Sequence, residues 1–288
     1  TFRTGGRADW LMETHRPKDV VAAMRLSREL ALPFTILGGG SNVLVGDGGA
    51  RGLVLRLRHG PIVQSAMNRV QADAGVTING LVRWTIQRRL AGLERWAGTP
   101  GTVGGAIRGN AHFEGRLLGD TVTAVELVDR TGAITRVLPA AMGFGYDESR
   151  VQHTGELVLR AEFSVSPGSA GVLRETARQS LRYRKHTQPL DRASAGCVFQ
   201  NPRPADGTLP PEVPYSAGAL IERAGLKGVR VGDAAVSSVH GNFIVNEGGA
   251  PARDVRALIE QCRKVVAEEF GIVLREELVY LGEFDEVE

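Results

Sequence analysis

Residues 36–45 read "ILGGGSNVLV", and residues 98–115 read "GTPGTVGGAIRGNAHFEG". In the first stretch, three glycines follow directly after an apolar run that is typical of a buried strand. Glycine has no Cβ, so the backbone amides of such a turn can approach an anion closely. The spacing is not GxGxxG, and residues 43–45 look extended rather than helical, which argues against a Rossmann turn. A turn that serves only the fold is the alternative interpretation.

The second stretch favours the anion-binding interpretation. Pro100 makes this turn rigid, and the Gly104-Gly105 pair allows a helix to begin close against a ligand. The two glycine-rich turns lie about sixty residues apart in one domain. Two such turns predict a large dinucleotide held from both sides, and they favour FAD over a mononucleotide.

The composition excludes several other classes of protein. The chain has 288 residues and a formal net charge of +3, and its positive charge is nearly all arginine. No segment is apolar enough to span a membrane and no leader is evident, so we expect a cytoplasmic protein without membrane insertion. We also expect a monomer with no nucleic-acid partner. The two cysteines are far apart and form no CxxC pair, so neither a disulfide framework nor a metal site is predicted.

Hydrophobic periodicity predicts mixed helices and strands. The expected helices span residues 17–32, 78–98, 173–184 and 252–270, with a short helix in the stretch 216–228 whose end is marked by Gly225. The expected strands lie at 9–12, 34–37, 53–57, 69–74, 122–128, 134–138, 157–165, near 229 and at 243–245, with a strand pair at the end of the chain. Cys262 lies on the apolar stripe of the last helix and is assigned to the core.

The composition changes at "SPGSAG", residues 166–171, a Ser/Pro/Gly cluster typical of a linker. The sequence therefore predicts an α+β protein with one domain over residues 1–167 and a second over residues 168–288. A Pro-rich connection at residues 202–214 is expected to be either a lid or a plain surface loop, with Tyr215 at its base.

Several motifs, taken in their order along the chain, resemble those of a known enzyme family. "TFRTGGRADW", the two glycine-rich stretches, "SAGCVFQNP", "SAGALIERAGLKG", "SSVHGNFIVN" and "LREELVYLG" follow one another from residue 1 to about residue 282. In this order they resemble the UDP-N-acetylenolpyruvoylglucosamine reductase family, flavoenzymes of peptidoglycan synthesis. The resemblance implies a vanillyl-alcohol-oxidase-type FAD-binding domain with two α+β subdomains, at about 1–60 and 61–167. A smaller α+β substrate-binding domain is implied for residues 168–288.

The resemblance also implies the reaction. NADPH reduces the bound FAD, and the flavin then reduces UDP-N-acetylglucosamine enolpyruvate to UDP-N-acetylmuramate. The implied FAD-binding residues are Gly38, Gly39, Gly40, Ser41, Asn42, Val43, Thr99, Pro100, Gly101, Thr102, Gly104, Gly105, Asn110 and Ala111. The implied substrate-binding residues are Tyr183, Arg184 and Asn201. His240 and Asn242 could either contact a ligand or serve the fold.

Reduction of the double bond needs a hydride on one carbon and a proton on its neighbour, so the protein must supply a positioned acid. The family's acid in SAG(S/C)xF corresponds to Cys197. A thiol has an ordinary pKa of about 8.5, so it is mostly protonated near neutrality and can donate without an activating partner. A small residue packed in a turn and a covalent nucleophile are the alternatives for Cys197.

The family's carboxyl partner corresponds to Glu277, with neighbouring Glu276 as a solvated bystander. A glutamate beside a substrate carboxylate is expected to have a raised pKa. The chain departs from the family in "FGYDESRVQH", because Asp147 stands where an arginine usually stabilises the enolate. Arg150 is the predicted replacement, and Arg160 and Arg184 are other sources of a guanidinium.

The loss of such a contact commonly costs roughly a hundredfold in rate. Two further hypotheses therefore stay open at this point. One is a flavin- and nucleotide-sugar-binding protein that has lost turnover, and the other is an oxidase of the same fold that uses oxygen.

Overall fold

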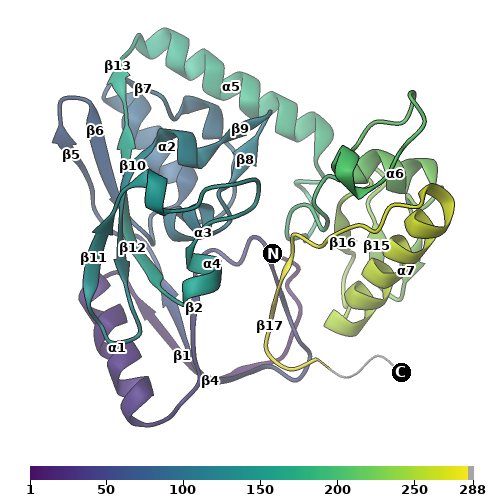
Figure 1. Ribbon diagram of the computed structural model, residues 1–288, viewed down its shortest axis with the longest axis horizontal. Coiled ribbons are helices and arrows are strands. Elements are labelled where there is room, and N and C mark those ends of the chain that lie inside the picture. Colours follow the sequence, from purple (N-terminus) through teal and green to yellow (C-terminus); the bar gives the residue numbers. More distant parts are fainter. Residues whose placement is uncertain (285–288) are drawn as a thin grey trace. The chain divides into compact units, whose positions relative to one another are not determined.

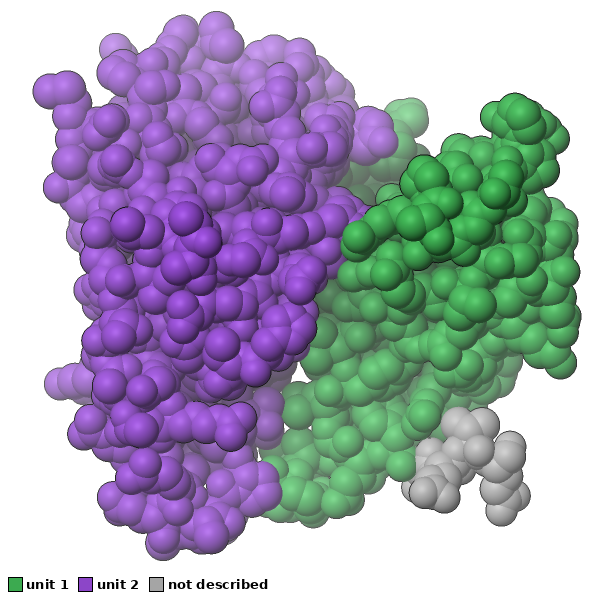
Figure 2. Space-filling view, viewed as in Figure 1, with its two compact units in different colours: residues 1–9, 40–51, 184–288 green, residues 10–39, 52–183 purple. Residues whose placement is uncertain are grey.

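The computed structural model describes residues 1–284, which divide into two compact units (Figure 2). The N-terminal unit comprises residues 10–39 and 52–183, and the C-terminal unit comprises residues 1–9, 40–51 and the chain from Arg184 onward. Phe2 and Leu44 are buried in the core of the C-terminal unit, which explains why the two N-terminal segments group with it. The division therefore does not follow a single cut near residue 167.

The N-terminal unit is built on a five-stranded antiparallel sheet (Figure 1). Its strand order is β11 (Ile134–Val137), β10 (Val122–Val128), β12 (Leu157–Ser164), β6 (Arg69–Asp73) and β5 (Ile62–Ala66). Ala161 and Phe163 on the central strand β12 are almost completely buried. α3 (Val103–Arg108) packs against β12 and β6, so this sheet positions the second glycine-rich turn.

A smaller sheet positions the first glycine-rich turn. Its order is β1 (Ala8–Thr14), β4 (Ala50–Leu57) and β2 (Phe34–Leu37), with β2 parallel to β4. α1 (Pro17–Glu29) connects β1 to β2 and begins at a proline, as the sequence predicts. β2 ends at Leu37 and delivers the chain directly to Gly38.

The helix predicted over residues 78–98 is wrong in its second half. α2 (Ile78–Gln87) is followed by β7 (Leu90–Ala91) and a 3-10 turn, η1 (Glu94–Trp96). Arg89 and Gly92 have positive φ, and β7 pairs with β13 (Ser166–Pro167). Leu90, Leu93 and Trp96 are buried all the same, so a strand and a turn preserve the apolar spacing that mimicked a longer helix.

Short elements and one long helix complete this part of the chain. They are β8 (His112–Phe113), β9 (Arg116–Leu117), η2 (Leu118–Thr121), η3 (Pro139–Ala141), α4 (Val151–Thr154) and α5 (Ala170–Thr187). α5 is longer at both ends than the predicted helix at 173–184 and begins inside the predicted linker.

The C-terminal unit contains the antiparallel sheet β14 (Arg230–Val231), β15 (Ala234–Val236) and β16 (Ile244–Asn246). α7 (Ala252–Phe270) packs on β15, and α6 (Ala217–Arg223) packs on α7 (Figure 1). Cys262 lies in this core as expected, and burial raises the pKa of its thiol to about 12. β17 (Val279–Leu281) pairs in parallel with β3 (Val43–Val45), far away in the sequence, instead of with a neighbouring terminal strand.

The Pro-rich connection at residues 202–214 contributes to the core of the C-terminal unit. It contains a 3-10 turn, η4 (Pro204–Asp206), and its Leu209 and Val213 are buried. The Tyr215 hydroxyl donates to the Gly207 carbonyl at 3.0 Å. These contacts argue against a lid, and the two buried side chains show that the connection is more than the plain surface loop of the alternative interpretation.

Candidate active site

The two glycine-rich turns pack against each other inside the N-terminal unit. A Cβ on Gly38 would lie 2.5 Å from Thr102 Oγ1, and a Cβ on Gly39 would lie 2.9 Å from the Gly101 Cα. Both distances are shorter than side chains tolerate, so these two glycines allow the turns to touch. The sequence predicts two turns around one ligand, and the structure brings the turns into contact.

The backbone amides at the start of α3 are used by the protein itself. Val103 N–H donates to the Val76 carbonyl at 2.8 Å, and Gly104 N–H donates to the Ala74 carbonyl at 2.9 Å. These two amides are therefore not donors for a ligand, because the segment after β6 already accepts their hydrogens.

The amides of the first turn differ in this respect. Within residues 1–284, the N–H groups of Gly39, Gly40 and Ser41 donate to no backbone or side-chain acceptor. Half-buried amides without a protein acceptor are suited to an anion. This observation fits the cofactor that the sequence predicts.

A cavity of about 180 Å³ lies beside these turns within the N-terminal unit. Its wall includes Gly38, Thr102, Gly105, Arg108, Glu156 and Leu157. A Cβ on Gly105 would meet nothing nearer than Thr102 Oγ1 at 3.7 Å, so protein packing does not require glycine there. A ligand that approaches the backbone closely would explain that glycine.

Arg150, the predicted replacement for the missing arginine, forms an ion pair. Its Nε and Nη2 donate to the two carboxylate oxygens of Glu156 at 2.8 and 3.0 Å. The Glu156 side chain is only 11% exposed, and the Thr154 hydroxyl also donates to it at 2.7 Å. The Arg150 guanidinium is therefore held in a bidentate ion pair with the Glu156 carboxylate, which lines the cavity.

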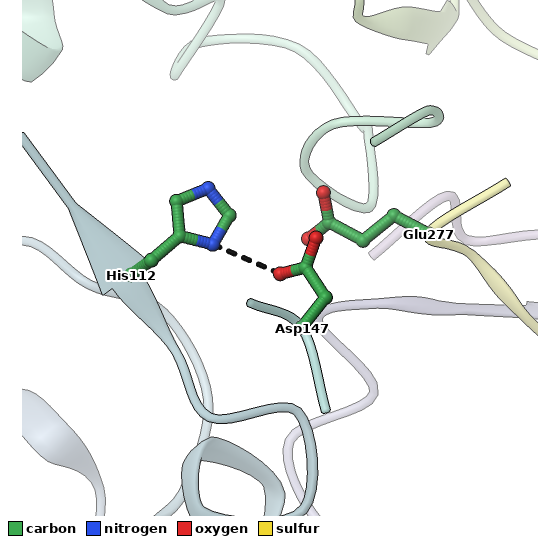
Figure 3. A group of neighbouring side chains, drawn as sticks. All are labelled: His112, Asp147 and Glu277. Atoms are coloured by element: carbon green, nitrogen blue, oxygen red, sulfur yellow. Dashed lines mark ion pairs between the residues drawn. The ribbon is translucent and has the colours of Figure 1, made fainter. Parts of the chain in front are cut away.

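Asp147 forms a pair that the sequence did not predict. Its carboxylate lies 2.9 Å from His112 Nδ1 and is only 7% exposed (Figure 3, which also draws Glu277 of the C-terminal unit). Asp147 has a φ of 55°, and the His112 ring lies 4.6 Å from that of Tyr146. Asn110, predicted to bind the cofactor, holds this loop by donating to the Gly145 carbonyl at 2.7 Å.

In the C-terminal unit, the backbone brings Cys197 and Glu277 together. Glu277 N–H donates to the Val198 carbonyl at 2.8 Å, next to Cys197. The buried Asn242 amide holds the same segment from the other side, since it accepts from Phe199 N–H at 2.9 Å and donates to the Phe199 carbonyl at 2.7 Å. Asn242 therefore serves the fold at the predicted catalytic segment.

The first glycine-rich turn also contacts this segment. The Asn42 side-chain amide donates to the Glu277 carbonyl at 3.0 Å, and Val279 N–H donates to the Asn42 carbonyl at 3.1 Å. A Cβ on Gly196, which has a φ of 80°, would lie 3.6 Å from the Ser41 carbonyl oxygen. Three predicted site segments thus meet in one unit: residues 40–43, the Cys197 motif and the Glu277 motif.

Glu276 is engaged elsewhere, because it forms an ion pair with Arg263 and accepts from the Tyr280 hydroxyl. These contacts give Glu276 a structural role beside Glu277, where the sequence predicts a solvated bystander.

The predicted substrate residues are distributed along the chain. Tyr183 on α5 is half exposed, with its ring edge-on to Phe113 at 5.7 Å, and Arg184 is buried. Asn201 Oδ1 accepts from Ala217 N–H at 3.0 Å, which fixes the start of α6. Sequence reasoning missed the roles of His112 and Glu156, because the partner of each lies in a separate segment and no local pattern indicates the pairing.

Comparison with known proteins identifies the class first. Residues 8–138 match the family described as FAD binding domain, so the chain is a flavoprotein of α+β fold, as predicted. Residues 188–281 match the C-terminal domain of UDP-N-acetylenolpyruvoylglucosamine reductase. No helix within residues 1–284 is both long enough and apolar enough to cross a membrane.

Individual relatives carry the same reductase name as the C-terminal family match. The UDP-N-acetylenolpyruvoylglucosamine reductase of Geobacillus thermodenitrificans is 38% identical over 281 residues, covering 98% of this chain and 89% of the relative. That of Anaeromyxobacter sp. is 41% identical, covering 98% and 85%. The crystal structure of the enzyme from Thermus caldophilus has a TM-score of 0.77 at 35% identity and covers 94% of this chain and 91% of that one. The chain belongs to the UDP-N-acetylenolpyruvoylglucosamine reductase family.

Proposed function

We propose that this chain catalyses the reduction of UDP-N-acetylglucosamine enolpyruvate to UDP-N-acetylmuramate, with FAD as cofactor and NADPH as reductant. Family membership over nearly the whole chain supports this activity in peptidoglycan synthesis. The observation that supports the residue assignment is the bond from Glu277 N–H to the Val198 carbonyl, because it joins the backbone of Glu277 to the residue that follows Cys197. Nothing in the comparisons supports a protein that has lost turnover.

The bound flavin supplies the hydride. In this proposal, Cys197 holds the proton at Sγ, and the hydrogen bonds of Val198 and Phe199 fix the backbone that follows it. An acid that is already positioned avoids the cost of ordering it during the reaction, and such a contribution is typically about 10²–10⁴-fold in rate.

Glu277 is proposed to act on the substrate carboxylate. Its main chain is held by two hydrogen bonds: the amide N–H donates to the Val198 carbonyl, and the carbonyl accepts from the Asn42 side chain. The catalytic assignment of Arg150 stays a prediction, and its contact with Glu156 supports a role in shaping the cavity wall.

An anaerobic experiment with two half-reactions tests the function. The purified protein, loaded with FAD, is first reduced with NADPH, and UDP-N-acetylglucosamine enolpyruvate is then added. Rapid return of the oxidised flavin spectrum is expected. A flavin that stays reduced contradicts the reductase, whereas rapid reoxidation by air without substrate indicates an oxidase.

Other assignments stay predictions. They are substrate binding by Tyr183, Arg184 and Asn201, the monomeric state, the cytoplasmic location and the lack of nucleic-acid partners. For Tyr183, half exposure on α5 is consistent with a ligand contact.

A further inference from the structure

Arg108 is the last residue of α3 and forms part of the cavity wall. Its carbonyl accepts from the Ser149 hydroxyl and from the Gln152 side-chain amide, both at 2.7 Å, so its backbone is fixed. On a helix, residues three and four positions apart share a face, and side chains lean toward the N-terminus. Gly104 and Gly105, which precede Arg108 by about one turn, accordingly line the same cavity as Arg108 and carry no side chain that could obstruct a ligand there.

The charge of Arg108 is uncompensated. Within residues 1–284, its guanidinium forms no ion pair. Glu156 is the other charged residue of the cavity wall, and it is already matched by Arg150. Although part of the Arg108 side chain is exposed, burial lowers the pKa of its guanidinium, the direction expected for a cation without an anionic partner. The cavity thus has a net positive charge.

Other donors are scarce on this wall. The amides of Val103 and Gly104 are bonded to the Val76 and Ala74 carbonyls, so they offer no hydrogen to a ligand. A guanidinium presents a planar fork of N–H groups that matches phosphate oxygens. At about 180 Å³, the cavity is smaller than a typical pocket for a drug-sized molecule and suits only part of a dinucleotide.

We propose that Arg108 binds the pyrophosphate of FAD in this cavity. The proposal rests on FAD being the cofactor of the chain, and it adds a charged side chain to the glycines predicted to bind the cofactor. Arg108 is accordingly a binding residue, and it takes no part in hydride or proton transfer.

The test measures FAD affinity of the flavin-free protein, by quenching of flavin fluorescence, for the unaltered chain and for Arg108→Gln and Arg108→Lys. The matched control is Arg83→Gln, because Arg83 is an exposed arginine on α2 that does not line the cavity. Arg108→Gln is expected to weaken FAD binding roughly ten- to a hundredfold, the usual range for a lost charge-assisted bond. Arg108→Lys should recover part of the affinity, and Arg83→Gln should change nothing.

Competition with ADP and adenosine identifies the part of FAD involved. The loss in Arg108→Gln should appear with ADP and be absent with adenosine, and added salt should weaken FAD binding less than it does in the unaltered chain. Equal FAD affinity in Arg108→Gln and the unaltered chain overturns the proposal. So does a weaker NADPH interaction with unchanged FAD affinity. Arg108→Lys supplies the same comparison if Arg108→Gln does not fold. If the unaltered chain itself does not bind FAD, the proposed function fails instead.

Discussion

The backbone amide of Glu277 donates a 2.8 Å hydrogen bond to the carbonyl of Val198, the residue that follows Cys197. The predicted catalytic residues Cys197 and Glu277 therefore belong to two backbone segments that are hydrogen-bonded to each other. Gln200 N–H extends the pairing by donating to the Arg275 carbonyl at 2.8 Å. Main-chain bonds of this kind fix the positions of the two backbone segments without using either functional group.

Cys197→Ala is expected to leave reduction of the flavin by NADPH unchanged and to slow its reoxidation by the enolpyruvyl substrate by about 10²–10⁴-fold, because the positioned proton is lost. Stopped-flow absorbance of the flavin measures both half-reactions separately. Cys197→Ser keeps a hydroxyl and should retain more activity than alanine. Equal reoxidation rates in Cys197→Ala and the unaltered chain would remove the thiol from the mechanism.

Asn242→Ala is expected to reduce both stability and turnover. The buried amide of Asn242 is bonded at both ends to Phe199, so its removal leaves two buried backbone groups without partners and lowers the free energy of unfolding by about 1–3 kcal/mol. Urea unfolding measures this loss. Asn68→Ala, at an exposed turn, is the control. Unchanged stability in Asn242→Ala would show that the two hydrogen bonds between Asn242 and Phe199 are not needed to hold the Cys197 segment.

Much of the fold was predictable because its signals are local. Proline at the start of α1, the apolar stripe of α7 and the alternation in β10 and β12 all lie within single segments. The prediction of a helix over residues 78–98 was wrong in its second half. Leu93 and Trp96 have helical spacing in the sequence, but they lie at a 3-10 turn that buries both side chains. The spacing of apolar residues predicts which residues are buried. It does not by itself distinguish a helix from a strand followed by a turn.

The site was predictable as a set of motifs and not as a set of contacts. The order of the motifs indicates FAD, a thiol and a carboxyl. The pairs Asp147–His112 and Arg150–Glu156 depend on how loops meet in space, and no spacing in the sequence encodes them. The same limit applies to the compact units, since only the structure shows that Phe2 is buried in the core of the C-terminal unit.

Two glycine substitutions should separate packing from ligand contact. Gly38→Ala places a Cβ against Thr102 Oγ1, so we expect the flavin-free protein to lose about 1–3 kcal/mol of stability. Gly105→Ala meets open space and should leave that stability equal or slightly higher, but it should weaken FAD binding. Thermal unfolding without FAD and fluorescence titration with FAD measure the two effects. FAD affinity unaffected by Gly105→Ala would mean that the backbone at Gly105 does not approach the cofactor.

His240 is expected to make stability depend on pH. Burial, and then the nearby Lys227, lowers the pKa of His240, and its Nδ1 accepts from Asn242 N–H at 3.1 Å. Only the neutral ring can accept there. The unfolded chain therefore binds the proton more readily, and the free energy of unfolding falls as pH drops below about 6.5, the ordinary pKa of histidine. Above that pH this contribution is fully present. Urea unfolding from pH 8 to 5 should show a smaller decline for His240→Asn, and parallel curves for the two proteins would exclude His240 as the source.

The pair Arg150–Glu156 offers a test that separates a structural role from a catalytic one. Arg150→Gln leaves the Glu156 carboxylate unpaired on the cavity wall, where it repels an anionic ligand and costs energy to bury. FAD affinity should fall about tenfold, which corresponds to about 1.4 kcal/mol. Glu156→Gln alone should change affinity little or raise it, because it removes negative charge from the wall.

The double variant Arg150→Gln with Glu156→Gln decides between the roles. If Arg150 acts through Glu156, the double variant recovers FAD affinity and turnover, because both charges are gone together. If the Arg150 guanidinium stabilises the enolate, FAD affinity recovers while reoxidation of the flavin by substrate stays slow. Fluorescence titration and anaerobic stopped-flow measure the two quantities on the same samples. We expect FAD affinity and turnover both to recover, since Nε and Nη2 of Arg150 are already bonded to the two Glu156 oxygens.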